Sequence, residues 1–434
     1  MRKYLIIGCG VAGISAAEAI RANDPTGVIT MISDDTNGFY SRPGLAYYLS
    51  GEIPQKQLYI FTEKDWRSLD VKIIPGQATR LFPGEHRLIV NHSDVLGYDR
   101  LLVATGASSV RLNLPGGNLP GVVYLDNLEE TRSIIQKSRK AKSVVVVGGG
   151  ILALELVEGL RARGRNVHYL MRGNRYWSNV LDETESNIVE ENLRHDGVQI
   201  HPQTEISSIL GKGNRMVAVQ TLKREQIPAN MVAVAVGIRP NIDLAIAAGL
   251  ETERGIVVND YLQSDNEDIF AAGDVAQVTD PETGKKSLDL LWQPARRQGN
   301  AAGINMAGGT ARYHRQVAIN VLRLAGVMTT IIGAVGSRGD EEISMMRGSS
   351  ETWRQLPNTI AVASGRGINQ VRILVSETTL QGAVVMGEQI LSQPLQELIS
   401  EKVDISSIRP FLLEGNEKLG RVLMEFWYNI KNQP

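Results

Sequence analysis

The chain has 434 residues and a formal net charge of −1, with 46 lysines and arginines against 47 aspartates and glutamates. This balance provides no strong field for binding nucleic acid or an anionic membrane. The single cysteine excludes an intrachain disulfide and a cysteine-held zinc or iron–sulfur site, and the six histidines show no metal-ligand spacing. No run of about 18 apolar residues occurs, so we expect no transmembrane helix and a cytoplasmic protein. The length predicts about three domains, and the cysteine and histidine content predicts no metal site.

The N-terminal segment predicts a turn that binds a dinucleotide. The apolar run KYLII is typical of a buried parallel strand, and Gly8, Gly10 and Gly13 follow it as GxGxxG before the helical stretch ISAAEAIRAN. The first glycine permits a tight turn, the second admits a pyrophosphate, and the third packs the helix on the strand. Cys9 occupies a variable position of this turn, so we expect a buried, inert thiol and no redox centre there.

The next strand, VITMI, is followed by Ser33 and Asp34. A carboxylate at this position would accept hydrogen bonds from ribose hydroxyls of the dinucleotide. We select Asp34 for that role, with Ser33 beside it at the strand end. A solvated acid in a turn is the alternative.

The same pattern recurs 140 residues later. The strand KSVVVV leads into Gly148 and Gly150, Ala153 takes the third position, and a helix follows. Each motif also has a later strand that ends in a glycine turn. These turns contain Ala104, Thr105 and Gly106 in LLVATG, and Gly237 in VAVAVG. The repetition predicts an α/β chain with two Rossmann-like dinucleotide-binding domains.

A further landmark is DIFAAGD, which ends in Gly273 and Asp274. Together with both glycine motifs and the ATG turn, it resembles the pyridine nucleotide–disulfide oxidoreductase superfamily of flavoproteins. The resemblance covers about the first 310 residues. It implies FAD in the first site and NAD(P)H in the second, with Asp274 on the ribityl chain of the flavin.

The resemblance also implies the domain boundaries. Residues 1–112 and 240–315 would form a discontinuous FAD-binding domain, and residues 113–239 an NAD(P)-binding domain inserted in it. Residues 316–434 would form a C-terminal α+β interface domain of a homodimer. In this last part, VRILVSETTLQGAVVMGEQI predicts two antiparallel strands, and PLQELISEKV and LGRVLMEFWYNI predict helices. Trp353, Trp427 and Tyr428 are candidates for its core or for an interface.

The stretch LWQPARRQG lies where the family places a helix N-terminus against the flavin pyrimidine. Pro294 suits a first helical turn, and the helix dipole would stabilise negative charge on reduced flavin. Trp292 and Gln293 would line that end. An ordinary amphipathic helix is the alternative.

The stretch GFYSRPGLAYYLSGE lies where relatives carry a redox cysteine in a CGLPYY-like sequence, and here Pro43 takes its place. We therefore expect no thiol-based disulfide or peroxide reduction. YSRP instead resembles the branch of rubredoxin reductases, ferredoxin reductases and nitrite reductase flavin domains, in which Arg42 would lie by the flavin. This branch often has a lysine near flavin N5 that pairs with a glutamate on the NAD-domain helix. In this chain Tyr47 occupies the lysine position, and Glu155 matches the glutamate. Glu155 would contact the nicotinamide amide or pair with Arg42, and a helix-surface acid is the alternative.

The end of the second strand of the second domain reads Met171, where an NAD-specific protein usually has an acid. Arg172 and Arg175 follow, and cations at this point favour the 2′-phosphate of NADPH. Alanine in place of the third glycine, at Ala153, also favours NADPH, because this position resembles that of glutathione reductase. A solvated basic turn is the alternative, and use of both nucleotides stays open.

These features favour an FAD-dependent NAD(P)H oxidoreductase. Hydride would pass from nicotinamide to flavin, and electrons would then leave to an acceptor such as rubredoxin or ferredoxin. Two alternatives remain from the sequence. One is an NAD(P)H oxidase that reduces oxygen, and the other is a redox-responsive flavoprotein that acts by nucleotide-dependent association.

Overall fold

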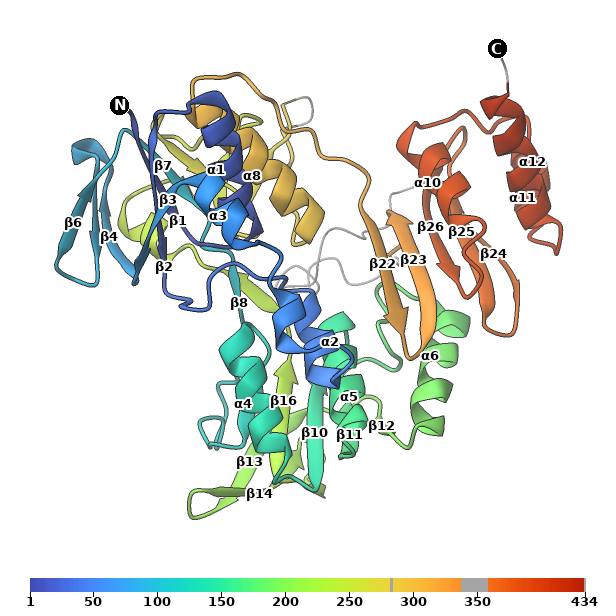
Figure 1. The fold of residues 1–434 in the computed structure, drawn as a ribbon. Helices are drawn as coiled ribbons and strands as arrows, with labels where there is room; N and C mark the ends of the chain where they lie inside the picture. Colours follow the sequence, from blue (N-terminus) through green and yellow to red (C-terminus); the bar gives the residue numbers. More distant parts are fainter. Residues whose placement is uncertain (282–283, 337–357, 433–434) are drawn as a thin grey trace. The chain divides into compact units, whose positions relative to one another are not determined.

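The computed structural model describes residues 1–281, 284–336 and 358–432. These residues form two compact units (Figure 1). The first comprises Met1–Val110, Asp126–Arg132 and Gly237–Arg315, and the second comprises Arg111–Leu125, Ser133–Val236 and Gln316–Pro434. Trp353 lies outside the described residues.

The first unit is built on a parallel five-stranded sheet in the order β19-β7-β1-β2-β3. The strands are β1 (Lys3–Ile7), β2 (Val28–Ser33), β3 (Val71–Pro75), β7 (Arg100–Val103) and β19 (Ile269–Ala271). β1 lies between β2 and β7, so the chain leaves it at the switch point where ligands bind in such sheets. Helices α1 (Val11–Asn23) and α8 (Trp292–Met306) pack closely, since a Cβ on Gly299 would lie 2.1 Å from the carbonyl oxygen of Ala12.

Smaller elements surround this sheet. The helices are α2 (Gly44–Ser50), η1 (Gln55–Leu58), α3 (Glu63–Leu69), η2 (Pro83–Glu85) and α7 (Asp243–Ala247). The antiparallel sheet β4-β5-β6 consists of Ala78–Phe82, Arg87–Val90 and Asp94–Gly97. The sheet β18-β20-β21 consists of Ile256–Val258, Ala276–Thr279 and Lys286–Leu288, and β8 (Ala107–Ser109) pairs with β17 (Ile238–Pro240).

The second unit repeats the arrangement around a parallel sheet in the order β12-β11-β10-β16-β9. The strands are β9 (Val122–Tyr124), β10 (Ser143–Gly148), β11 (Asn166–Leu170), β12 (Gln199–His201) and β16 (Met231–Ala235). The helices are α4 (Leu128–Ser138), which begins in the first unit, α5 (Ile151–Ala162) and α6 (Glu183–His195). A separate antiparallel sheet contains β13 (Ile206–Lys212), β14 (Arg215–Thr221) and β15 (Gln226–Pro228). β10 lies between β11 and β16 as β1 lies between β2 and β7, which agrees with the predicted duplication.

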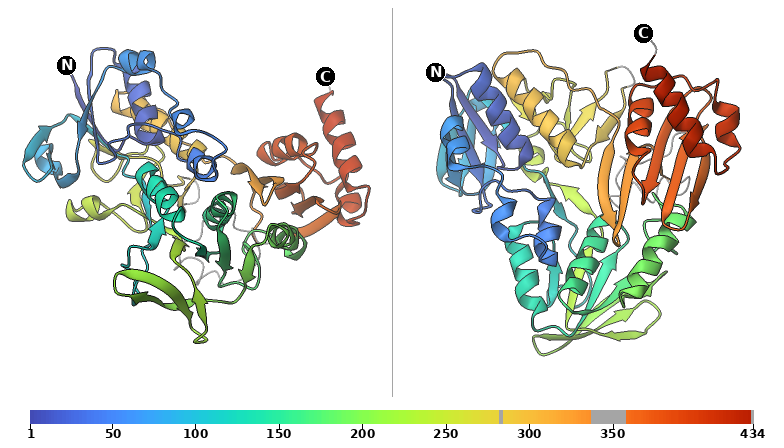
Figure 2. Two further views of the ribbon diagram at one scale, coloured as in Figure 1. Left: turned by 60° about the horizontal axis from the view of Figure 1, so that its bottom comes forward. Right: turned by 45° about the vertical axis from the view of Figure 1, so that its right-hand side comes forward.

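The C-terminal part of the second unit is an antiparallel sheet in the order β22-β23-β26-β25-β24. Its strands are β22 (Ile319–Leu324), β23 (Val327–Gly333), β24 (Ile360–Arg366), β25 (Asn369–Val375) and β26 (Leu380–Met386). Helices α10 (Ser392–Ser400), α11 (Arg409–Leu413) and α12 (Leu419–Lys431) pack on one face of this sheet (Figure 2). The pairing of β25 with β26 is antiparallel, as predicted. α10 starts at Ser392, two residues before the stretch PLQELISEKV that predicts it.

Two aromatic side chains of α12 differ in their surroundings. Trp427 packs against the core of the C-terminal sheet, and its indole N–H donates to Glu397 at 2.7 Å. Tyr428 is 64% exposed and is the better candidate for an interface. Among the described residues, no helix is long and apolar enough to cross a bilayer.

Candidate functional site

The turn after β1 needs glycine for two reasons. Gly8 has φ +112°, and a Cβ there would lie 2.1 Å from the carbonyl oxygen of Ala104. A Cβ on Gly13 would lie 2.1 Å from the carbonyl oxygen of Gly8, so helix and strand meet with no room for a side chain. At Gly10, by contrast, no protein atom lies within 4 Å of an added Cβ. Gly8 and Gly13 therefore serve the protein's own packing, and Gly10 leaves space for a ligand.

The N-termini of α1 and α5 suit an anion. Gly10 and Gly150 are the N-cap residues, neither supplies a side-chain cap, and neither first turn contains an acid. Helices α3 and α6 differ, because each has a capping box and two acidic residues in its first turn. Uncapped amides at the positive end of a helix dipole are what a pyrophosphate needs. Both turns thus fit a dinucleotide.

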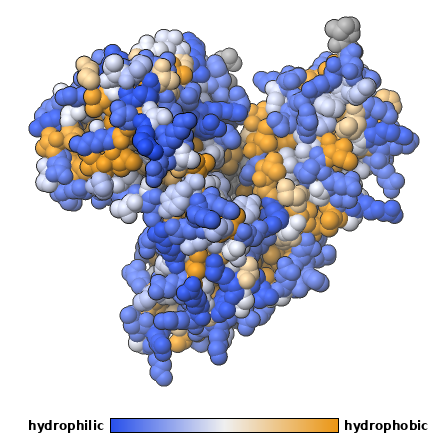
Figure 3. All heavy atoms as spheres, in the orientation of Figure 1, coloured by the Kyte–Doolittle hydropathy of each residue, from blue (hydrophilic) through white to orange (hydrophobic). Residues whose placement is uncertain are grey.

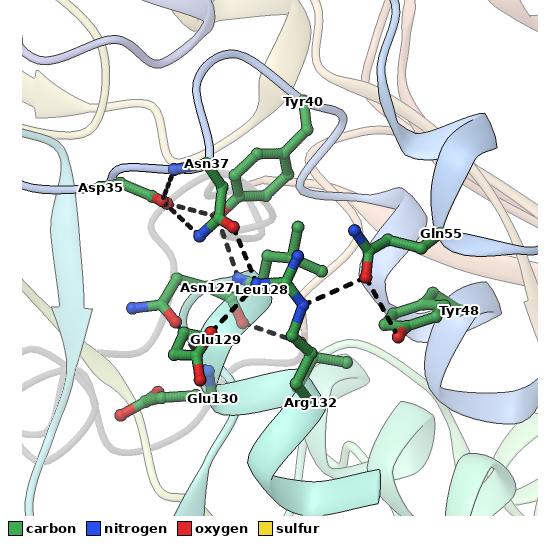
Figure 4. Close-up of polar contacts among 11 residues, drawn as sticks. Asp35, Asn37, Tyr40, Tyr48, Gln55, Asn127, Leu128, Glu129, Glu130 and Arg132 are labelled. Atoms are coloured by element: carbon green, nitrogen blue, oxygen red, sulfur yellow. Dashed lines mark hydrogen bonds and ion pairs between the residues drawn. The ribbon is translucent and has the colours of Figure 1, made fainter.

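The end of β2 carries two adjacent acids with different roles. Asp35 accepts hydrogen bonds from the backbone N–H of Asn37 at 3.0 Å, from its side-chain amide at 2.8 Å, and from the Tyr40 hydroxyl at 2.7 Å (Figure 4). Asp35 therefore holds the loop together. Asp34 is exposed beside it, and Ser33 is buried, with its hydroxyl donating to the carbonyl of Asp35. Asp34 as the ribose ligand stays a prediction.

A polar network that we did not foresee fastens this loop to residues 126–132. The backbone N–H of Leu128 donates to the Tyr40 hydroxyl at 3.0 Å (Figure 4). The Arg132 guanidinium donates to Asn37 at 2.8 Å and to Gln55 at 3.1 Å. The start of α4, which leads toward the second unit, is thereby held against the loop that follows β2.

The charge of Arg42 influences Asp274 in the first unit. Arg42 is exposed and donates to the carbonyl of Asp126 at 2.9 Å. Asp274 follows Gly273, which has φ +81°. Burial raises the pKa of Asp274 to about 6, and the Arg42 charge partly offsets that rise. A half-buried carboxyl with no hydrogen-bond donor among the described residues fits ligand hydroxyls.

The other predicted residues of the first unit lie at ends of its elements. Thr105 donates from its hydroxyl to the carbonyl of Asn241 at 2.9 Å, and the backbone N–H of Asn241 donates to the carbonyl of Gly106 at 2.9 Å. Gly237 has φ +129°, and its carbonyl accepts from Val110 at 3.0 Å. These bonds hold together, within the first unit, the segment that ends at Val110 and the segment that begins at Gly237.

Helix α8 begins with one packed and one exposed side chain. The Trp292 ring stacks on Phe39 with centroids 6.1 Å apart and planes at 16°, and it packs against the core of the first unit. Gln293 is exposed. The first turn of α8 has neither a side-chain cap nor an acid, so its amides can face a ligand. Tyr47, at the expected lysine position, is 42% exposed on α2.

The sole thiol is unsuited to redox chemistry. Cys9 is buried, and burial together with the charge of Asp35 raises its pKa to about 12. A thiol with this pKa supplies almost no thiolate at neutral pH. Pro43 is exposed at the N-cap of α2, so the start of this helix presents no thiol.

The second glycine turn repeats the first with a different third residue. Gly148 has φ +154°, and a Cβ there would lie 2.3 Å from the carbonyl oxygen of Ala235 and 2.9 Å from the Cβ of Ala153. Ala153 is fully buried. At Gly149 and Gly150, added Cβ atoms would meet nothing within 4 Å. The turn therefore accommodates alanine at its third position and keeps its open side.

Glu155 lies on α5 one turn beyond this loop. It is half-buried, and burial, with a smaller contribution from Glu158, raises its pKa to about 7. Glu155 belongs to the second unit and Arg42 to the first, and a pairing between them stays a prediction.

The two predicted arginines in the loop after β11 differ in their surroundings. Met171 is buried, and Arg172 is exposed. Arg175 turns into its own loop, where its guanidinium donates to the carbonyls of Ser178 at 3.3 Å and Leu181 at 3.4 Å. Arg172 is thus the cation available to a ligand, and Arg175 supports the loop.

These features fit two dinucleotide sites, each at the switch point of a parallel sheet. The family described as pyridine nucleotide-disulphide oxidoreductase matches residues 2–299. The chain belongs to this family, and it is an oxidoreductase that uses FAD and a nicotinamide dinucleotide.

Curated relatives are similar over most of the chain. Identity to rhodocoxin reductase of Rhodococcus erythropolis is 31%, covering 71% of this chain and 73% of that protein. Identity to the biphenyl dioxygenase system ferredoxin–NAD(+) reductase component of Paraburkholderia xenovorans is 29%, covering 93% of this chain and 98% of that protein. Identity to NADH oxidase of Methanocaldococcus jannaschii is 27%, with 98% and 94% covered.

Solved structures share the fold. The structure of the covalent putidaredoxin reductase–putidaredoxin complex has a TM-score of 0.84 at 22% identity, covering 100% of this chain and 99% of that one. The NAD-dependent persulfide reductase from A. fulgidus has a TM-score of 0.81 at 26% identity, covering 94% and 78%. The predicted family, fold class and enzyme class are therefore confirmed.

The open side of the first turn gives a direct test. Gly10→Ala adds a methyl group where the protein has space but a pyrophosphate would lie. We expect the purified protein to lose most of its FAD, measured as flavin absorbance per chain, while its far-ultraviolet circular dichroism is unchanged. Gly84→Ala, in an exposed turn that is equally open, is the control and should retain FAD. Full FAD in the Gly10 variant would contradict the assignment.

Proposed function

We propose that this protein passes hydride from NAD(P)H to FAD and then electrons to a small protein of the rubredoxin or ferredoxin type. The observation that carries the proposal is the buried, high-pKa thiol of Cys9, the only cysteine in the sequence. Without a usable thiol, bound flavin is the redox group through which electrons can leave. Flavin accepts a hydride and can release single electrons, which suits a one-electron protein acceptor.

The relatives support this choice of acceptor. Rhodocoxin reductase, the rubredoxin-NAD(+) reductase of Pseudomonas putida and the ferredoxin–NAD(+) reductase component are all named for such partners. The NADH oxidase of Methanocaldococcus jannaschii aligns with 98% of this chain, so oxygen reduction is the second candidate.

We assign the parts of the chain as follows. FAD binds residues 1–112 and 240–315, with its pyrophosphate at the Gly10 turn and its ribityl chain on Asp274. NAD(P)H binds residues 113–239, with its pyrophosphate at the turn of Gly148 and Gly150. Arg42 and Tyr47 face the flavin ring, as do Trp292 and Gln293 at the start of α8. The protein acts in the cytoplasm.

Residues 316–434 form the interface of a homodimer in this proposal. Apolar side chains gather over β22 and β23 in Figure 3, where Val321 is 60% exposed and Met328 is 43% exposed. Exposed apolar surface of this kind is typical of an interaction site.

The pKa of Glu155 predicts a pH dependence. A carboxylate near the nicotinamide would favour the positive charge that hydride donation leaves on the ring. The rate of flavin reduction in anaerobic stopped-flow should therefore rise as pH increases through about 7, the raised pKa of Glu155. Glu155→Gln should be slow at every pH and lack this inflection. Glu158→Gln removes the neighbouring like charge, so it should move the inflection to lower pH. An unchanged inflection in the Glu155 variant would contradict the role.

The exposed Arg172 predicts the nucleotide preference. Its guanidinium can pair with the 2′-phosphate of NADPH, and the buried Met171 offers no carboxylate to a 2′-hydroxyl. Arg172→Gln should raise KM for NADPH about tenfold and leave KM for NADH unchanged. Arg215→Gln, which removes an exposed charge on β14, is the matched control. Equal effects of the Arg172 change on both nucleotides would exclude a 2′-phosphate site there.

Turnover with different acceptors tests the proposed function. With NADPH as donor, we expect oxidised rubredoxin or a [2Fe–2S] ferredoxin to be reduced at least tenfold faster than oxygen is consumed without it. If oxygen is consumed at least as fast as rubredoxin and ferredoxin are reduced, the protein is the oxidase instead. No NAD(P)H oxidation with any of these acceptors would refute both functions.

A further inference from the structure

Arg372 on β25 is a buried cation whose hydrogen bonds leave its own sheet. Its Nε and Nη2 donate to the two carboxylate oxygens of Glu185, each at 2.9 Å. Nη2 also donates to the carbonyl of Val180 at 2.7 Å, and Nη1 donates to the carbonyl of Val335 at 3.0 Å. Arg372 is 7% exposed and Glu185 is 1% exposed. The Arg372 guanidinium therefore connects the C-terminal sheet by hydrogen bonds to the first turn of α6 and to the loop before it.

That loop connects β11 to α6 and carries Arg172. Within it, the backbone N–H groups of Val180 and Leu181 donate to the carbonyl of Trp177 at 2.8 and 3.0 Å. The backbone N–H of Trp177 donates to the carbonyl of Gly149 at 3.0 Å. A continuous path of hydrogen bonds thus runs from Arg372 through Val180 and Trp177 to the second glycine turn.

The last bond on this path has a consequence for ligand binding. A peptide group is planar and trans, so its carbonyl and N–H point in opposite directions. By holding the carbonyl of Gly149, Trp177 fixes the direction of the Gly150 N–H at the N-cap of α5. This amide belongs to the uncapped N-terminus that we assign to a pyrophosphate.

The loop is held in a conformation that it would not adopt alone. Trp177 has φ +47°, a left-handed conformation that is rare and strained for a bulky residue. Such a conformation persists only where surrounding bonds maintain it. Two of these come from α6, since Glu190 accepts from the N–H of Tyr176 and Ser186 donates to its carbonyl, both at 2.8 Å.

We propose that Arg372 is a positioning residue for the second dinucleotide site, through which the C-terminal sheet keeps the Trp177 loop and the Gly149–Gly150 peptide in a nucleotide-binding arrangement. A second contact supports the connection, because the Asn192 side chain on α6 donates to the carbonyl of Ala325, in the turn between β22 and β23, at 3.0 Å. α6 lies alongside the C-terminal sheet in both views of Figure 2. The inference rests on the proposed binding of NAD(P)H at this site.

Nucleotide binding to the FAD-loaded protein tests the proposal. Isothermal calorimetry with NADP⁺ and NAD⁺ is compared for wild type, Arg372→Met and Arg372→Lys, with melting temperature and FAD content measured on each sample. We expect about tenfold weaker binding of both nucleotides to the methionine variant. The lysine variant should be intermediate, since one ammonium cannot serve both Glu185 and Val180. In turnover, KM for NAD(P)H should rise with kcat nearly unchanged.

Two further variants separate positioning from loss of folding. Arg409→Met removes a half-buried arginine that donates to the carbonyl of Ser376 within the C-terminal part, and it should bind nucleotide like wild type. The double variant Arg372→Met with Glu185→Met leaves no uncompensated buried charge, so it should fold even where the single variant does not. It should still bind weakly, because the Val180 carbonyl has lost its donor.

The outcomes are distinct. Wild-type affinity in a folded Arg372 variant, single or double, would overturn the positioning role and leave the proposed function intact. An equal loss in Arg409→Met would also overturn it, because the effect would then be a general loss of C-terminal packing. No nucleotide binding to the wild-type protein would overturn the proposed function and this inference with it.

Discussion

Both proposed nucleotide sites depend on backbone amides that stay available to an anion at the N-termini of two helices. A side-chain cap or an acid in the first turn would satisfy those amides internally, as it does in α3 and α6. In α1 and α5 the N-cap is a glycine without a cap, and the strand before it lies between two parallel neighbours. Glycines at Gly8 and Gly148 then permit the left-handed backbone that turns each chain from strand to helix. Both sites follow from this one requirement.

The choice between thiol and flavin chemistry follows from the first of these turns. Cys9 lies within the turn that we assign to the pyrophosphate, and it is buried in the core of the first unit. Burial raises the pKa of its thiol, and Asp35, which organises the adjacent loop, raises it further. The residue at which a thiol would be expected on α2 is Pro43. Electron transfer in the proposed function is therefore assigned to the flavin.

Sequence predicted those parts whose signal is local. The strand–glycine–helix motifs, the duplicated sheet and the antiparallel β25–β26 pair are all encoded within short windows of chain. The contacts that hold the sites in shape were missed because their partners lie far apart in sequence. Leu128 and Tyr40 are 88 positions apart, Arg132 and Asn37 are 95, and Arg372 and Glu185 are 187. The left-handed Trp177 gave no signal either, because bulky residues are not expected in that conformation.

The most direct test of the central claim is the number of electrons that the protein takes up. An anaerobic titration with dithionite, followed by flavin absorbance, measures reducing equivalents per bound FAD. A flavin that works without a thiol partner should be fully reduced by two electrons, with no band from charge transfer between thiolate and flavin. Uptake of four electrons per FAD would show a second two-electron redox group and contradict the account.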